Sequence, residues 1–305
     1  MKRNDFCVRL LVAQLFAATV CFLLLSQSSS SASDESVSVA EKSPHHWFTS
    51  YSAAVSEALS RRCMLLVWFQ NPAHAEADAA FEARVLNDPA IRDLVAKTVA
   101  VRLPLDAKVQ VGGKPVTLLE HPAFAEMLGG SGLAMLDMTD SAGSQHRRVT
   151  SVYPFTGQYI SKSHLAVLLT LPPGTLTQRT MIFAVRTHPE QPASASSELS
   201  SLLLTEAASH SAHQASILLQ GHHNWDSRFH SINARLPPGH VATEVCAESW
   251  PGETLVQAAQ ECVHSWRQSP GHWSAVRERH ALFGYDIKRG TNGIWYATGI
   301  FGRRM

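Results

Sequence analysis

The order of apolar and polar positions divides the first half of the chain into runs of strand and helix length. Residues 64–69 are continuously apolar, which is typical of a strand buried on both faces of a sheet. Further strands are expected at 98–103, 133–138 and 148–153. Helices are expected at 47–60, 75–86, 90–96, 122–128 and 161–169. Strands that alternate with helices predict a layered α/β domain.

The second half begins after Pro172-Pro173-Gly174, which cannot belong to a helix interior and marks a domain boundary. A short strand is expected at 180–185, a long helix at 198–220 and an amphipathic helix at 254–266. Apolar runs at 283–287 and 294–301 flank an Asn-Gly turn and predict a terminal β-hairpin. The fold class is therefore α/β, with two domains at 45–172 and 176–305.

A single histidine follows the helix expected at 254–266. Ser269-Pro270-Gly271 ends that helix, so His272 is expected in a rigid turn between a glycine and Trp273. A histidine held in this way is suited to bind a ligand. It is equally suited to pack against Trp273, and this stretch alone does not separate the two roles.

The first 32 residues have the pattern of a targeting segment. Lys2, Arg3 and Arg9 precede an apolar run at 10–25, and Ser31-Ala32-Ser33 suits a cleavage site. We expect a signal peptide at 1–32, with an uncleaved membrane anchor as the alternative, and a linker at 33–44. The protein is then secreted, periplasmic or on the cell surface, with membrane attachment through this segment as an option.

The composition narrows the chemistry. The net charge of +1 favours neither nucleic acid nor an anionic membrane surface as a partner. The chain holds 16 histidines, many of them between 210 and 280, which favours metal or proton chemistry there. Outside the targeting segment there are three cysteines, and Cys246–Cys262 is the best-placed pair if one bridge forms; free buried cysteines are equally plausible.

The run at 81–91, Phe-Glu-x-x-Val-Leu-x-Asp-Pro-x-Ile, together with the preceding apolar strand, resembles the thioredoxin fold over about residues 45–170. By spacing, the Cys-x-x-Cys of that family falls at 75–78, where this chain has no cysteine. Thiol–disulfide exchange needs a thiolate nucleophile and a resolving thiol. We therefore expect a thioredoxin-like domain without redox activity.

The C-terminal half resembles the CAP superfamily (cysteine-rich secretory, antigen 5 and pathogenesis-related proteins) in its bacterial form, over about residues 180–305. The resemblance rests on Trp266-x-x-Ser-Pro-Gly-His272 and on the closing pattern Phe-Gly-Tyr-Asp … Gly-Ile-Trp-Tyr-Ala-Thr-Gly-Ile-Phe-Gly. It implies an α-β-α sandwich with a central cleft. In that cleft two histidines and one or two glutamates bind a divalent cation.

The resemblance assigns these ligands to particular positions. The second histidine is His272, and the first is His222 or His223, with Gly221-His222 and Arg228 matching the family spacing slightly better. The glutamate falls on Glu248, with Glu244 as the alternative, and the second glutamate is replaced by Ser269. Two imidazoles and one carboxylate with an open position suit Zn²⁺ best.

Two functions follow from these expectations. The first is an exported, non-enzymatic binding or scaffold protein, whose cleft holds a divalent cation or small ligand. Its partner is an unknown protein, lipid or small molecule. The alternative is a metal-dependent hydrolase or peptidase that uses His222 or His223, Glu248 and His272, since an open zinc site can activate water.

Overall fold

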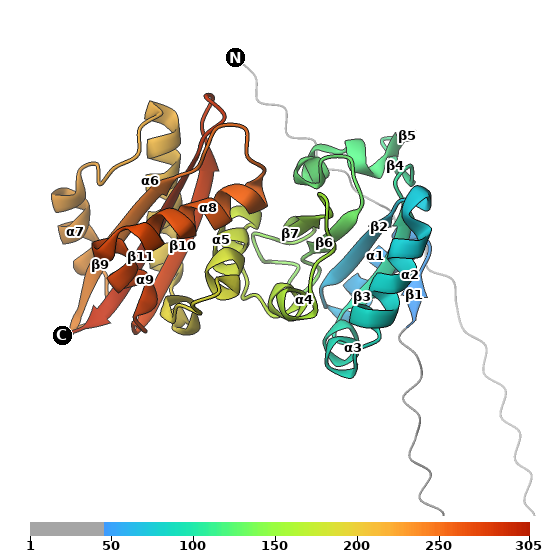
Figure 1. Ribbon diagram of the computed structural model, residues 1–305, viewed down its shortest axis with the longest axis horizontal. Coiled ribbons are helices and arrows are strands. Elements are labelled where there is room, and N and C mark those ends of the chain that lie inside the picture. The colour runs from blue at the N-terminus through green and yellow to red at the C-terminus, as the bar shows by residue number, and fades with distance from the viewer. Residues whose placement is uncertain (1–45) are drawn as a thin grey trace, which may run out of the picture. The chain divides into compact units, whose positions relative to one another are not determined.

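The computed structural model describes residues 46–305, which belong to one compact unit with two main β-sheets (Figure 1). The fold is mixed α/β, so the expected fold class is confirmed. The expected signal peptide (1–32) and linker (33–44) lie outside the described residues. Within 46–305 no helix has the length and apolar character needed to cross a membrane.

Four strands of the first sheet lie where strands were expected, but Trp47–Phe48 forms a fifth strand within the stretch predicted as a helix at 47–60, and the helix begins only at Tyr51. Its order is β1-β3-β2-β6-β7, with β2 parallel to β3 and antiparallel to β6. The five strands are β1 (Trp47–Phe48), β2 (Leu65–Gln70), β3 (Val99–Pro104), β6 (Gly132–Leu136) and β7 (Val149–Pro154). Residues Leu65 to Phe69 of the central strand are fully buried, as their continuous apolar run predicts.

Helices flank this sheet at the expected places. They are α1 (Tyr51–Arg61), α2 (Ala75–Phe81) with a π-helical turn at Glu82–Leu86, α3 (Pro89–Val95) and α4 (Lys162–Leu169), with short 3-10 turns at Pro72–His74, Leu118–Glu120 and Pro122–Met127. Asp88 caps α3 by accepting a hydrogen bond from the Ala90 N–H at 3.0 Å. A small hairpin of β4 (Lys108–Val111) and β5 (Lys114–Thr117) was not predicted. The thioredoxin-like assignment and the domain boundaries stay predictions.

The prediction of a strand at 180–185 is wrong, because these residues belong to helix α5 (Leu176–Thr187). Thr175 and Gln178 form a reciprocal capping box that starts the helix. Gln178 and every residue from Arg179 to Val185 are buried, so the helix has no polar face. The run Met181 to Val185 is continuously apolar, and periodicity alone does not distinguish a short run of this kind from a buried strand.

The second sheet has the order β8-β10-β11-β9 and contains the predicted terminal hairpin. Its strands are β8 (Glu198–Leu199), β9 (His240–Glu248), β10 (Leu282–Arg289) and β11 (Trp295–Arg304). Helix α6 (Ser201–Ile217) crosses one face so closely that a Cβ on Gly284 would lie 2.3 Å from the Leu203 carbonyl carbon.

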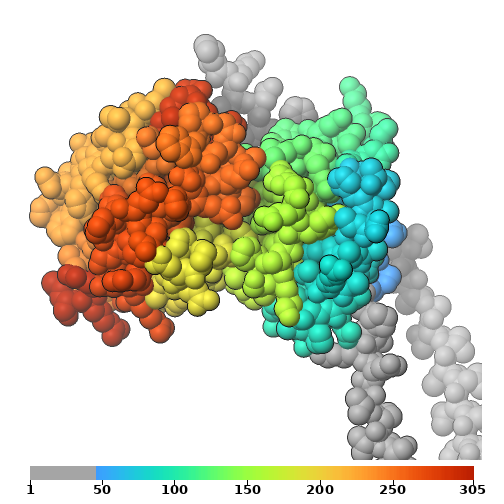
Figure 2. Space-filling model, viewed as in Figure 1, coloured from blue at the N-terminus to red at the C-terminus, as the bar shows by residue number. Residues whose placement is uncertain are grey.

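The opposite face of the second sheet carries α5 and α8 (Leu255–Gln268). The Tyr285 ring of β10 packs there against Trp266, with ring centroids 5.8 Å apart. The sheet is therefore enclosed between helical layers. Figure 2 shows the α8 and α9 region at the surface of the molecule.

Helix α8 ends at Gln268, close to the expected end, but the expected rigid turn after it is wrong. Pro270 occupies the first turn of a further helix, α9 (Pro270–Arg277), where its missing N–H has no helical partner to lose. His272 therefore projects from the first turn of α9. Helix α7 (Trp225–Asn233) is the remaining helix of the C-terminal half.

The suggested Cys246–Cys262 bridge is not formed, because both cysteines and Cys63 are free. Val245 and Ala247 of β9 pack into the same core cluster as Cys262 of α8. Since side chains alternate along a strand, Cys246 faces the other side of the sheet. The sheet separates the two sulfur atoms.

Candidate functional site

The segment between α6 and α7 positions two adjacent histidines. The Gln214 side chain accepts a hydrogen bond from the Gly221 N–H at 3.1 Å and donates one to Thr298 Oγ1 at 2.9 Å. His210 Nε2 donates to the Gly221 carbonyl at 2.9 Å. Both polar groups of Gly221 are thus held, which fixes the backbone that carries His222 and His223.

His222 and His272 lie side by side, with their rings tilted at 47°. Their Nε2 atoms are 3.3 Å apart, and their ring centroids are 5.6 Å apart. Two imidazoles bound to one tetrahedral zinc at about 2.0–2.1 Å would hold their nitrogens about 3.3–3.4 Å apart. A hydrogen bond is usually shorter, about 2.9–3.0 Å. The observed spacing fits a shared metal ion without further movement.

Glu244 of β9 fixes the orientation of His222. Its Oε1 lies 3.0 Å from His222 Nδ1, and its Oε2 accepts from Arg228 Nη2 at 2.5 Å. Burial raises the pKa of Glu244, but the hydrogen bonds from His222 and Arg228 outweigh it, and the net shift is downward. The ionised carboxylate can only accept, so His222 carries its proton on Nδ1 and presents a lone pair on Nε2.

Glu248 does not take part in this arrangement. It lies four residues further along β9, opposite Tyr296, and is exposed. Among residues 46–305 its carboxylate forms no hydrogen bond. The structure brings Glu244, the expected alternative, to His222. The signal in the sequence is an acidic residue beside the apolar run Val245 to Ala247, where only a partnered carboxylate is tolerated.

His223 points away from His272. Its Nε2 donates to the Leu219 carbonyl at 3.2 Å, and its ring lies beside His210 and His213. Of the two candidates for the first histidine, the structure therefore joins His222 to His272 and Glu244. His223 belongs to a separate group of imidazoles.

A buried group lies behind His222. Ligand atoms of His210, Glu244 and Cys246 all fall within 4.8 Å of one another. Burial, followed by the charge of Glu244, raises the pKa of the Cys246 thiol, so the thiol stays protonated. His210 uses Nε2 on Gly221, and Glu244 is engaged by Arg228 and His222. Neither Glu244 nor the protonated Cys246 thus offers a free ligand atom.

His272 is suited to act as a ligand, and its partner His222 remains accessible. Burial, and then His222, lowers the pKa of His272, which favours the neutral imidazole. The His222 side chain is 41% exposed. A wide cavity of about 730 Å³ adjoins it, lined by His222, Asn224, Trp225, Asp226, Ser227 and Arg228. An ion held by the two histidines would keep open positions on this side.

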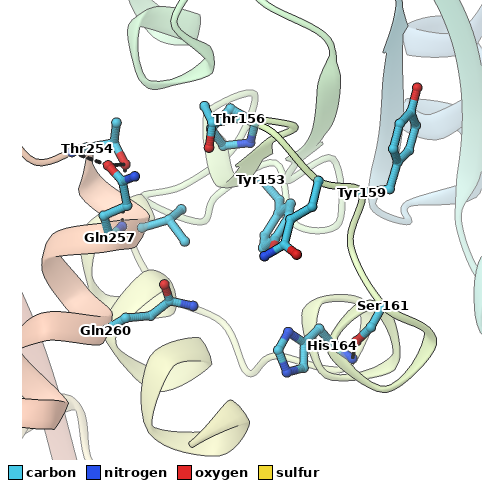
Figure 3. A pocket seen from close by; sticks show the side chains of 11 residues that line it. Tyr153, Thr156, Tyr159, Ser161, His164, Thr254, Gln257 and Gln260 are labelled. Atoms are coloured by element: carbon cyan, nitrogen blue, oxygen red, sulfur yellow. Dashed lines mark hydrogen bonds between the residues drawn. The ribbon is translucent and has the colours of Figure 1, made fainter. Parts of the chain in front are cut away.

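A second pocket, of about 310 Å³, lies beside the N-terminal half of α8 and has different chemistry. Figure 3 shows Thr254, which caps α8, and Gln257 and Gln260 of α8 facing the segment that carries Tyr153 and His164. Its lining holds no acidic or basic side chain apart from His164, whose pKa is lowered by burial. This pocket offers a single imidazole and does not resemble a metal site.

Comparisons with known proteins add little to the site. No family model matches the chain, and no curated protein matches it. Among solved structures it is similar to an outer surface protein from Borrelia burgdorferi, with 19% identity and a TM-score of 0.29. That match covers 36% of this chain and 78% of the other. A likeness this weak carries no argument about fold or function.

Proposed function

We propose that this chain is an exported binding or scaffold protein of the CAP type, whose cleft holds a divalent cation between His222 and His272. The observation that carries the proposal is the 3.3 Å separation of the two Nε2 atoms, which matches two ligands of one tetrahedral ion. Zinc suits this site best, because imidazole nitrogen is among its preferred ligands.

The surroundings of His222 supply what a metal-binding histidine needs. A carboxylate that accepts the second ring N–H fixes the tautomer and raises the basicity of the ligand nitrogen. Glu244 has this position, and Arg228 holds Glu244 in turn. Two protein ligands leave two positions of a tetrahedral ion for water or for a donor from the bound partner.

The partner is then a protein, lipid or small molecule that supplies a donor atom at the open positions. The cavity beside His222 offers both an aromatic surface at Trp225 and a cation at Arg228. Export rests on the targeting pattern of residues 1–32. It is part of the proposal, since those residues lie outside the described structure.

The hydrolase alternative has weaker support in the geometry. A general base must be free to take a proton from the attacking water. Both oxygens of Glu244 are engaged, one by His222 and one by Arg228. Glu248 forms no hydrogen bond in the described residues and does not join the pair of histidines.

The test is zinc binding to the full chain, measured by equilibrium dialysis with metal analysis. We expect His222→Ala and His272→Ala each to remove one equivalent of zinc. His264→Ala is the matched control, because this exposed histidine of α8 pairs only with Gln268. Unchanged zinc content in both cleft variants, with circular dichroism showing intact folds, would overturn the proposal.

A peptide-hydrolysis screen separates the two functions. The binding function predicts zinc at the cleft and no turnover in the wild type. Turnover that is lost in His272→Ala but kept in His264→Ala would favour the hydrolase instead.

A further inference from the structure

A second group of imidazoles lies on the other side of the Gly221 turn. His210 and His213 are three residues apart on α6 and so share one face of the helix. His223 closes over them from the turn. The ring centroids are 6.2 Å apart for His210–His213, 6.1 Å for His210–His223 and 5.6 Å for His213–His223.

These separations are close to those of three ligands of one ion. With zinc about 2.0–2.1 Å from a ring nitrogen, the ring centroid lies about 3.2 Å from the metal. A tetrahedral angle then places two centroids about 5.3 Å apart, and an angle of about 120° places them about 5.6 Å apart. One pair already has this spacing, and the other two need to close by less than about 1 Å.

The hydrogen bonds of two of these rings each leave one ring nitrogen available. His210 donates its Nε2–H to the Gly221 carbonyl, and His223 donates its Nε2–H to the Leu219 carbonyl. Carbonyl oxygens only accept, so both rings carry a lone pair on Nδ1. A ring N–H donated to a backbone carbonyl is the usual arrangement behind a metal-binding histidine.

The third ring, His213, must move for the three histidines to bind one ion. The ring nitrogens of the three histidines do not all lie within 4.8 Å of one another in the present arrangement. The His213 side chain is exposed and forms no hydrogen bond within residues 46–305. Rotation about its side-chain bonds therefore breaks no hydrogen bond as it turns toward Nδ1 of His210 and His223.

We infer that His210, His213 and His223 form a second site, for a divalent transition-metal ion that prefers imidazole, namely Zn²⁺, Cu²⁺ or Ni²⁺. The site goes beyond the proposed function and shares no ligand with the His222–His272 pair. His210 nevertheless lies 3.7 Å from Glu244, the carboxylate that orients His222. The two sites are therefore neighbours on either side of one fixed turn.

The experiment counts zinc ions in the full chain by equilibrium dialysis and metal analysis. We expect two equivalents in the wild type and one in His213→Ala, whose exposed side chain can be removed without disturbing the core. His272→Ala should also retain one equivalent, and the double variant His213→Ala/His272→Ala should retain none. His264→Ala should keep both.

The outcomes distinguish failure of this inference from failure of the proposed function. If His213→Ala and the double variant His213→Ala/His223→Ala retain the zinc content of the wild type, the second site does not exist, whatever His272→Ala does. If His272→Ala has no effect but His213→Ala loses an equivalent, the second site stands and the proposed function fails.

A spectroscopic measurement identifies the ligands directly. Cu²⁺ added to His272→Ala should give an electron paramagnetic resonance spectrum with hyperfine coupling to three imidazole nitrogens. The same measurement on His272→Ala/His213→Ala should show fewer coupled nitrogens and weaker Cu²⁺ binding, by roughly 10-fold or more. Identical spectra from the two variants would overturn the assignment.

Discussion

Glu244 shows how a single buried carboxylate can orient several side chains around it. Its side chain is 1% exposed, yet it contacts His222, Arg228 and His210. A buried charge is costly unless it is paired and hydrogen-bonded. The contacts to His222 and Arg228 meet that need and at the same time set the direction in which His222 presents its lone pair.

We predict that Glu244→Gln weakens zinc binding at the His222–His272 site by about 10–100-fold, as is usual when the hydrogen-bond partner of a metal-binding histidine is altered. An amide can present its N–H to His222 and so favour the wrong tautomer. Isothermal titration of folded protein measures the affinity. Glu248→Gln, an identical change four residues away, should leave it within about twofold; a larger loss in Glu248→Gln would return the role to Glu248.

A second buried carboxylate gives a prediction for stability. Asp78 is 5% exposed and accepts a hydrogen bond from the Tyr159 hydroxyl at 2.7 Å. Tyr159→Phe should lower the free energy of unfolding at neutral pH by about 1–3 kcal/mol, because Asp78 loses this donor. Urea unfolding measures it. Tyr153→Phe is the control, since the Tyr153 hydroxyl forms no hydrogen bond among the described residues.

The same hydrogen bond predicts a pH dependence. Burial, and then Asp78, raises the pKa of Tyr159 above the usual value for a tyrosine. A raised pKa means that the folded state favours the protonated phenol. Its stabilising contribution is complete below about pH 10, the unfolded value, and is lost as the pH rises through the higher folded-state value. The stability difference between wild type and Tyr159→Phe should therefore shrink above about pH 10, and a constant difference would contradict this.

At the scale of single elements, the sequence pattern predicts the main strands better than it predicts helices α5 and α9. The continuous apolar run of β2, the strand β3 and the Asn-Gly turn of the terminal hairpin lie close to their expected places. Helix α5 was predicted as a strand because its run Met181 to Val185 is continuously apolar, which is also typical of a buried strand. Helix α9 was missed because Pro270 can start a helix as well as end one.

The sequence predicted most residues of the candidate site, but not which of the alternatives meet. The Ser-Pro-Gly-His segment singled out His272, and the resemblance to the CAP superfamily added the pair His222 and His223. Which of the two adjacent histidines meets His272 depends on the Gly221 backbone, and that is held by Gln214 and His210 of α6. The choice between Glu244 and Glu248 depends on the position of β9 in its sheet. Local periodicity predicts neither the contacts of the Gly221 backbone nor the place of β9 in its sheet.

The close crossing of α6 over β10 makes Gly284 a sensitive position. A Cβ there would lie 2.3 Å from backbone carbon and 2.4 Å from backbone nitrogen of α6. Gly284→Ala should lower the free energy of unfolding by about 3 kcal/mol or more, since the helix must move away. Denaturant unfolding followed by circular dichroism measures the loss.

Gly271→Ala is the matched control for this prediction. Gly271 lies in α9, and a Cβ there would meet nothing within 4 Å. Alanine favours a helix over glycine by up to about 1 kcal/mol. We expect Gly271→Ala to leave stability unchanged or slightly higher, and equal losses in both variants would contradict a specific contact at Gly284.

At the scale of the whole described unit, α5 ties the two sheets together. Helix α5 contacts β7 of the first sheet and β10 of the second. Arg179 of α5 is 3% exposed and donates to Ser151 Oγ at 2.8 Å and to the carbonyls of Leu171 and Pro172 at 2.9 and 2.8 Å. The buried guanidinium of Arg179 thus contacts the predicted domain boundary at residues 172–174 through the Pro172 carbonyl.

We predict that Arg179→Ala lowers the free energy of unfolding by about 3 kcal/mol, because three acceptors lose a charged donor. Tryptophan fluorescence and far-ultraviolet circular dichroism should give one common unfolding midpoint in the wild type. Arg84→Ala, an exposed arginine without a described partner, should change stability by less than about 0.5 kcal/mol. Equal effects of the two variants would contradict a tying role for Arg179.

The Gly221 turn has a consequence for how this protein can change during evolution. His222 and His223 are consecutive, yet one meets His272 and the other meets His210 and His213. Inserting or deleting one residue between Leu218 and His222 would shift both imidazoles and disturb both groups at once. The turn should therefore tolerate substitutions at its exposed positions, such as Leu219, while its length stays constant among related proteins.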